Sequence, residues 1–173
     1  MENARRLRFV PVGAANRAQA ERIAPAPGQE GFIESVRECL AEADALALWR
    51  PVCVYDGALL IGFAMYGLFP TPAPGRLWLD RLLIDGRYQG RGYGRRAVAG
   101  LIERLAAEYP CERVYLSVYA ENARAVQLYR RFGFRFNGER DTKGELVMED
   151  YSQDALMLML HAASLGLPFL PCL

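Results

Sequence analysis

The chain has 173 residues, of which 52% are hydrophobic and 24% charged, a composition typical of one globular domain. Its four cysteines stand apart without a CxxC pair and His161 is the only histidine, which argues against a zinc cluster and against any triad that needs histidine. Basic and acidic side chains nearly cancel, 21 against 20, so we expect no nucleic-acid partner.

Apolar spacing predicts alternating strands and helices along residues 1–150. Between Gly31 and Ala45 apolar residues recur at helical spacing, and the pair Asp56-Gly57 favours a tight hairpin turn. In chain order we expect a strand over 7–12, helices over 16–23 and 31–45, hairpin strands over 52–55 and 58–69, a strand over 76–85, a helix over 95–109, a strand over 113–119, a helix over 122–132, and strands over 134–139 and 145–149. This order predicts a single α/β domain, with one mixed sheet and helices on both faces.

The two ends of the chain differ from this pattern. Residues 1–9 carry three arginines but no apolar run, so we expect no secretory signal and a cytoplasmic location. Ala155 to Leu173 has no formal charge, but Gly166, Pro168 and Pro171 interrupt it, and we expect an apolar tail over 151–173 rather than a membrane span. Such a tail would cover the sheet or form a homodimer surface, and both alternatives stay open.

A glycine-rich segment, Gln89-Gly90-Arg91-Gly92-Tyr93-Gly94-Arg95-Arg96, lies between an apolar strand and a predicted helix. Glycines leave backbone N–H groups unobstructed, and the positive end of the helix dipole attracts anions. No Gly-Lys-Ser/Thr follows, and Arg95 stands where a dinucleotide fingerprint needs its third glycine. The segment therefore predicts a phosphate-binding loop, to which Arg91, Arg95 and Arg96 would add contacts; the alternative is a flexible turn.

A second motif follows the next predicted strand. Leu116-x-Val118 precedes Asn122, Ala125, Leu128-Tyr129 and Gly133-Phe134 at fixed spacing. Together with Gln89-x-x-Gly92-x-Gly94, this pattern resembles the GNAT superfamily of N-acetyltransferases. Further segments, among them Phe32-Ile33-Glu34-Ser35 and Trp78-Leu79-Asp80-Arg81, are similar to the bacterial spermine/spermidine (diamine) acetyltransferases over roughly residues 28–149.

The resemblance implies acetyl-CoA as cosubstrate, bound without a metal where the fourth and fifth strands splay apart. The implied coenzyme contacts run from the strand end through the glycine loop to the next helix, at Leu82, Leu83, Ile84, Gln89, Gly90, Arg91, Gly92, Tyr93, Gly94, Arg95, Asn122 and Ala125. The resemblance also implies that residues 1–150 form an acetyltransferase domain.

Two residues are candidates for the chemistry. Tyr129 lies two helical turns after Asn122, on the same face, and the resemblance implies that it protonates the departing thiolate of coenzyme A; alone, it would suggest a core tyrosine. An alkylammonium must lose a proton before it attacks a thioester, and Asp80 is the candidate base. Asp80 is equally a candidate polyamine anchor, or a structural partner of Arg81 or Arg76.

Five acids and one arginine lie between Glu30 and Asp44, a charge pattern that suits a polycation. Glu34 is the predicted substrate anchor, whereas Glu38 and Glu42 are expected on a solvated helix face. Aromatic residues at Tyr55, Tyr66, Phe69 and Trp78 would line the groove or pack in the core. Residues 81–96 hold five arginines and one aspartate, so two segments of opposite sign cancel in the total charge.

The expected function is acetyl transfer from acetyl-CoA to a primary amine of spermidine or spermine, by direct attack. An acyl-enzyme is not expected, because neither motif contains a cysteine. The alternatives are an acetyltransferase for another amine, such as an aminoglycoside or a protein N-terminus, and a non-catalytic acyl-CoA-binding sensor.

Overall fold

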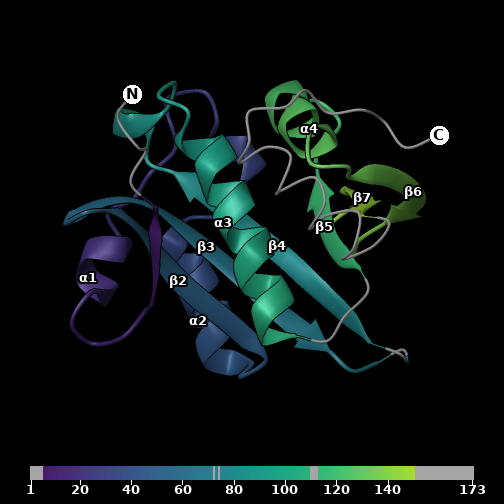
Figure 1. Cartoon of the computed structure of the whole chain (residues 1–173), viewed down its shortest axis with the longest axis horizontal. Helices are drawn as coiled ribbons and strands as arrows, with labels where there is room; N and C mark the ends of the chain where they lie inside the picture. Colours follow the sequence, from purple (N-terminus) through teal and green to yellow (C-terminus); the bar gives the residue numbers. More distant parts are fainter. Residues whose placement is uncertain (1–5, 72, 74, 110–112, 151–173) are drawn as a thin grey trace.

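A computed structural model describes residues 6–71, 73, 75–109 and 113–150, which form one seven-stranded sheet with helices on both faces (Figure 1). The strands are β1 (Arg8–Pro11), β2 (Trp49–Asp56), β3 (Leu59–Phe69), β4 (Arg76–Ile84), β5 (Val114–Val118), β6 (Arg135–Arg140) and β7 (Leu146–Glu149). The helices are α1 (Arg17–Ala20), α2 (Val36–Ala45), α3 (Tyr93–Glu108) and α4 (Ala123–Arg130), with 3-10 turns at Glu30–Phe32 and Gly86–Tyr88. The order of strands is β1-β2-β3-β4-β5-β7-β6, and only β4 and β5 pair in parallel.

Alternation along the central strands separates two buried clusters. Ala64 and Tyr66 of β3 pack with Val98, Leu101, Ile102 and Leu105 of α3 on one face. Phe63 and Met65, which alternate with them, pack with residues of α1 and α2 on the other. Figure 1 shows α3 lying across the sheet beside β4. Because both faces are covered, β4 is apolar at six of its nine positions, and the adjacent charges Asp80 and Arg81 within it are conspicuous.

The sheet opens between β4 and β5, as the resemblance implied. The two strands pair only at Leu77 with Val114 and at Trp78 with Tyr115, although β4 continues to Ile84 and β5 to Val118. Along the rest of these two strands the facing backbone edges carry no β4–β5 ladder bonds. An extended ligand can therefore pair with the free edge of β4.

A bulge in β4 lies just before this opening. Met65 pairs with Arg81 and Tyr66 with Leu79, so Asp80 has no Cα partner on β3. An extra residue of this kind bends a strand and re-aims its side chains. The bulge therefore sets the direction of Asp80 and Arg81 relative to the opening.

Several predicted boundaries were wrong, among them the start of β2, at Trp49 rather than 52, and the end of α1, at Ala20 rather than 23. The hairpin turn is Gly57–Ala58 rather than Asp56–Gly57, because Asp56 still pairs with Leu59 and Gly57 takes the positive φ of 61° at the first turn position. Helix α2 begins at Val36, not near Gly31, because Ser35 and Glu38 form a capping box, with Ser35 N–H donating to Glu38 Oε2 at 2.9 Å. Helix α3 begins two residues earlier than expected, at Tyr93, after the N-cap Gly92.

The predicted tail over 151–173 lies outside the described residues, so the division at residue 150 stays a prediction. Among the helices that the structure does describe, none is long and apolar enough to span a bilayer.

Candidate active site

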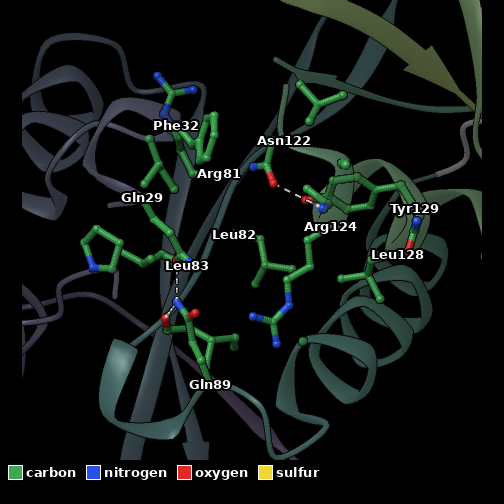
Figure 2. A pocket seen from close by; sticks show the side chains of 18 of the residues that line it. Gln29, Phe32, Arg81, Leu82, Leu83, Gln89, Asn122, Arg124, Leu128 and Tyr129 are labelled. Carbon is green, nitrogen blue, oxygen red and sulfur yellow. Dashed lines mark hydrogen bonds between the residues drawn. The ribbon is translucent and has the colours of Figure 1, made fainter. Parts of the chain in front are cut away.

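A cavity of about 660 Å³ occupies the opening between β4 and β5. Its walls are the end of β4, the glycine loop with the start of α3, and α4. Figure 2 shows Arg81, Leu83 and Gln89 facing Asn122, Leu128 and Tyr129 across it. Of the residues predicted for catalysis, substrate anchoring and coenzyme contacts, the cavity brings together all except Arg91 and Arg96, namely Glu34, Asp80, Leu82, Leu83, Ile84, Gln89, Gly90, Gly92, Tyr93, Gly94, Arg95, Asn122, Ala125 and Tyr129.

Not every polar group of the glycine loop points into the cavity. The Arg91 guanidinium lies over the Tyr88 ring at 5.8 Å and does not line the cavity. Arg96 also departs from the expectation, because it donates to Asp56 at 3.3 Å. The Gln89 amide donates to Ile84 O at 3.0 Å and to Gln29 Oε1 at 2.9 Å, so it ties the loop to the end of β4 (Figure 2).

The loop ends in a helix start suited to an anion. Gly92 is the N-cap of α3, with a left-handed φ of 78°, and the first helical hydrogen bond there is from Arg96 N–H to Gly92 O. The N–H groups of Tyr93, Gly94 and Arg95 therefore have no partner within the helix, and all three residues line the cavity. Such a helix start, with Arg95 beside it, fits the pyrophosphate of a coenzyme A.

Helix α4 forms the opposite wall, where Asn122 Oδ1 accepts from Ala125 N–H at 3.2 Å. This cap fixes the start of the helix and thereby the position of Tyr129 near its end. Tyr129 packs edge-on against Phe134, with ring centroids 5.9 Å apart, and it also lines the cavity. Burial raises the pKa of Tyr129 to about 12, so its hydroxyl keeps its proton at neutral pH and can donate it.

Asp80 lies on the β4 wall, with its side chain only 14% exposed. Burial raises the pKa of Asp80 to about 6, with Glu42 and Glu34 adding to the effect and Arg81 opposing it. Arg81 donates to the Asp80 carboxylate in a close contact. The other expected partner, Arg76, instead pairs with Glu139 at 2.6 Å.

Arg81 is the centre of an ion-pair cluster, of which only the pair with Asp80 was among the expectations from the sequence. Its side chain is 8% exposed, and besides Asp80 it contacts Glu34 Oε2 at 2.9 Å and Glu42 Oε2 at 3.4 Å. Glu42 therefore does not belong to a purely solvated face, whereas Glu38 is exposed and caps α2 as described above. Two adjacent charges within an apolar strand, Asp80-Arg81, were the signal for this cluster in the sequence.

Lys143 completes the cluster from the turn between β6 and β7, where its ammonium contacts Glu34 Oε1. Burial alone would raise the pKa of Glu34, but the hydrogen bond from Lys143 and the charge of Arg81 hold it below its usual value. Glu145, two residues on, lines the cavity, and burial raises its pKa. Asp80, Glu34 and Glu145 thus make the β4 end of the cavity acidic.

The four aromatic residues proposed for the groove do not line the cavity. Tyr66 is buried and donates to Glu108 Oε2 at 2.8 Å, and Phe69 packs edge-to-face with Trp49 at 4.7 Å between centroids. Trp78 stacks on Tyr115, and Tyr55 lies under Arg8. Phe32 supplies an aromatic wall instead.

Comparison with known proteins shows the family to which this chain belongs. Residues 16–134 match the model of the Acetyltransferase (GNAT) family. The chain belongs to this family. It is 47% identical over 137 residues to the spermine/spermidine N(1)-acetyltransferase of Bacillus subtilis, covering 77% of this chain and 90% of the relative.

Solved structures share the fold. The spermidine N-acetyltransferase of Vibrio cholerae, in complex with CoA and spermine, superposes with a TM-score of 0.64 at 18% identity over 83% of this chain and 93% of its own. The aminoglycoside acetyltransferase AAC(6')-Ib with coenzyme A gives 0.74 at 18% identity, over 88% and 98%. Acetyltransferases with different acceptors thus share this scaffold, and the walls of the cavity must supply the choice of amine.

Proposed function

We propose that this protein transfers the acetyl group of acetyl-CoA to a primary amine of spermidine or spermine. The observation that carries the proposal is a single cavity with an anion-binding helix start at one wall and an acidic cluster at another, with Asp80 and Tyr129 both lining it. The 47% identity to a spermine/spermidine acetyltransferase supports the same acceptor class.

The residues present fit acetyl-CoA. The open edge of β4 over Leu82, Leu83 and Ile84 suits the amides of an extended pantetheine arm, and the start of α3 suits its pyrophosphate. Acetyl-CoA, when bound, supplies the acetyl group as a thioester. No group of three or more His, Cys, Asp and Glu in the described part of the chain is placed to hold a metal ion.

The protein's residues then handle two protons. Asp80, ionised above a pKa of about 6, accepts the proton that the substrate ammonium loses, directly or through water. As the new C–N bond forms and the C–S bond breaks, the Tyr129 hydroxyl donates its proton to the leaving sulfur, and the second proton that the attacking nitrogen loses restores the Tyr129 hydroxyl. Glu34 attracts a second ammonium of the same substrate.

A panel of amines tests the proposal. Coenzyme A release should be measured with spermine, spermidine, putrescine, an aminoglycoside and a peptide N-terminus, with acetyl-CoA alone as the control for hydrolysis. We expect the highest kcat/KM with spermidine or spermine, and a product mass increased by one acetyl group. Turnover of the aminoglycoside or peptide alone would contradict the polyamine assignment, and no turnover of any amine would favour a coenzyme sensor.

A further inference from the structure

Lys143 is the only lysine in the sequence, and it reaches the acidic end of the cavity from a distant hairpin. Its ammonium contacts Glu34 Oε1, while Arg81 Nε lies 2.9 Å from Glu34 Oε2. Both oxygens of the predicted substrate anchor are therefore already opposite internal cations. A substrate ammonium can form a close ion pair with a Glu34 oxygen only if one of these two cations leaves that oxygen.

The two cations differ in how firmly they are held. The Arg81 side chain is 8% exposed and contacts three carboxylates, so removing it would leave the largely buried charge of Asp80 without its partner. The Lys143 side chain is 44% exposed and forms an ion pair with Glu34. Lys143 is thus the exchangeable partner of Glu34.

The hairpin itself does not depend on the Lys143 side chain. Asp141 Oδ1 accepts from the N–H groups of Lys143 and Glu145, each at 2.9 Å, and Asp141 O accepts from Gly144 N–H at 3.1 Å. These three hydrogen bonds, none of which uses the Lys143 side chain, fix the turn. The lysine chain can therefore move into solvent while the hairpin stays in place.

We propose that the Lys143 ammonium occupies the subsite for the distal ammonium of the substrate and is displaced when a polyamine binds. The inference rests on the proposed function. A lysine side chain is a primary ammonium on four methylenes, chemically the same group as the aminobutyl arm of spermidine, so it fits the same carboxylate. Exchange of one ammonium for another conserves the ion pair at Glu34. A monoamine has no second, distal ammonium, so its binding leaves Lys143 at Glu34.

The single lysine allows a direct test without turnover. Protein labelled with ¹³C at the lysine ε-carbon gives one lysine signal, which should shift on addition of spermidine or putrescine and stay unchanged with butylamine at equal ionic strength. Glu34→Gln protein should lack the response to spermidine. No shift with spermidine at concentrations shown by calorimetry to saturate the protein would overturn the proposal, as would an equal shift with butylamine.

Kinetics provide the second test. Lys143→Met should lower KM for spermidine about three- to fivefold, the size expected for releasing one partly exposed ion pair, with kcat within about twofold. Lys143→Arg should keep the wild-type KM or raise it, and the KM for butylamine should not change. Arg135→Met, which removes an exposed charge from the same hairpin, is the matched control and should have no effect.

The outcomes separate the two proposals. An unchanged or increased KM for spermidine in Lys143→Met, with the wild type active on spermidine, would overturn the exchange and leave the proposed function intact. Failure of the wild type to acetylate any polyamine would overturn the function instead, and the lysine signal would then still report whether a diamine displaces Lys143.

Discussion

At the scale of single residues, the pKa of Asp80 is set by where the chain buries it. The side chain is 14% exposed, and the loss of water raises its pKa to about 6 against the opposing charge of Arg81. A carboxylate with this pKa is mostly ionised at pH 7.5 and still binds a proton more tightly than an exposed aspartate does. The three roles open for Asp80, namely base, anchor and structural partner, predict different defects.

Asp80→Asn should lower kcat about 100-fold or more at pH 8 with little change in KM, as expected for loss of a general base. In the wild type, kcat/KM should fall as the pH decreases through about 6, because Asp80 then takes up a proton, and the variant should lack this limb. Glu145→Gln is the control, since Glu145 also lines the cavity with a raised pKa but should leave the limb in place. A raised KM alone would make Asp80 an anchor, and a lower Tm alone a structural partner.

Tyr129→Phe removes only a hydroxyl and keeps the packing against Phe134. We expect kcat to decrease about 100-fold, because the leaving thiolate loses its proton donor, while the Kd for coenzyme A changes less than twofold. Single-turnover kinetics and calorimetry measure the two quantities. Tyr119 lies outside the cavity, so Tyr119→Phe should keep the kcat of the wild type and serves as the control. If the two variants were equally active, the role of Tyr129 would be purely structural.

At the scale of elements, the start of α3 combines backbone shape with ligand binding. Gly92 has a φ of 78°, and a Cβ built on it meets no atom within 4 Å. Space therefore does not require glycine here, but the left-handed backbone does. The same conformation leaves the first N–H groups of α3 open to the cavity.

Gly92→Ala should accordingly cost about 1–2 kcal/mol of folding stability, because alanine resists the left-handed conformation. If the loop relaxes to avoid this strain, the N–H groups turn away and the Kd for coenzyme A increases. Thermal unfolding and calorimetry test both effects. Gly13→Ala, equally free of steric contact and without a positive φ, is the control, and equal behaviour of the two variants would disprove the backbone argument.

Local signals made several elements predictable. The strand over β5 and the helices α3 and α4 lie within two residues of the expected bounds because their apolar spacing is regular and Asn122 marks a cap. The predicted start of α2 was wrong although the sequence contains its Ser35-x-x-Glu38 box, because Phe32 continues the helical spacing of apolar residues beyond the true start. That boundary matters for the site, since it places Glu34 before the helix, where it reaches Arg81 and Lys143.

At the scale of the whole molecule, the distribution of charged side chains in space differs from their distribution along the sequence. Arg81 belongs by sequence to the basic segment 81–96, yet it is buried among Asp80, Glu34 and Glu42. Arg37, the one base within the acidic segment, pairs with Glu21 of another element at 2.8 Å. The acidic end of the cavity is therefore defined by which side chains meet, and a segment's net charge describes it only in part.

The sequence by itself determined the sheet-and-helix order and the glycine loop, because both depend on short-range spacing and backbone preferences, whereas the residues expected around the cavity came from the resemblance of its motifs to the GNAT superfamily. The tertiary structure alone decided that Arg91 and Arg96 turn away, that Asp80 is buried beside Arg81, and that Lys143 meets Glu34 across 109 positions of sequence. Desolvation and ion pairing depend on every element packed around a group. Long-range contacts therefore set the chemistry of the acidic end.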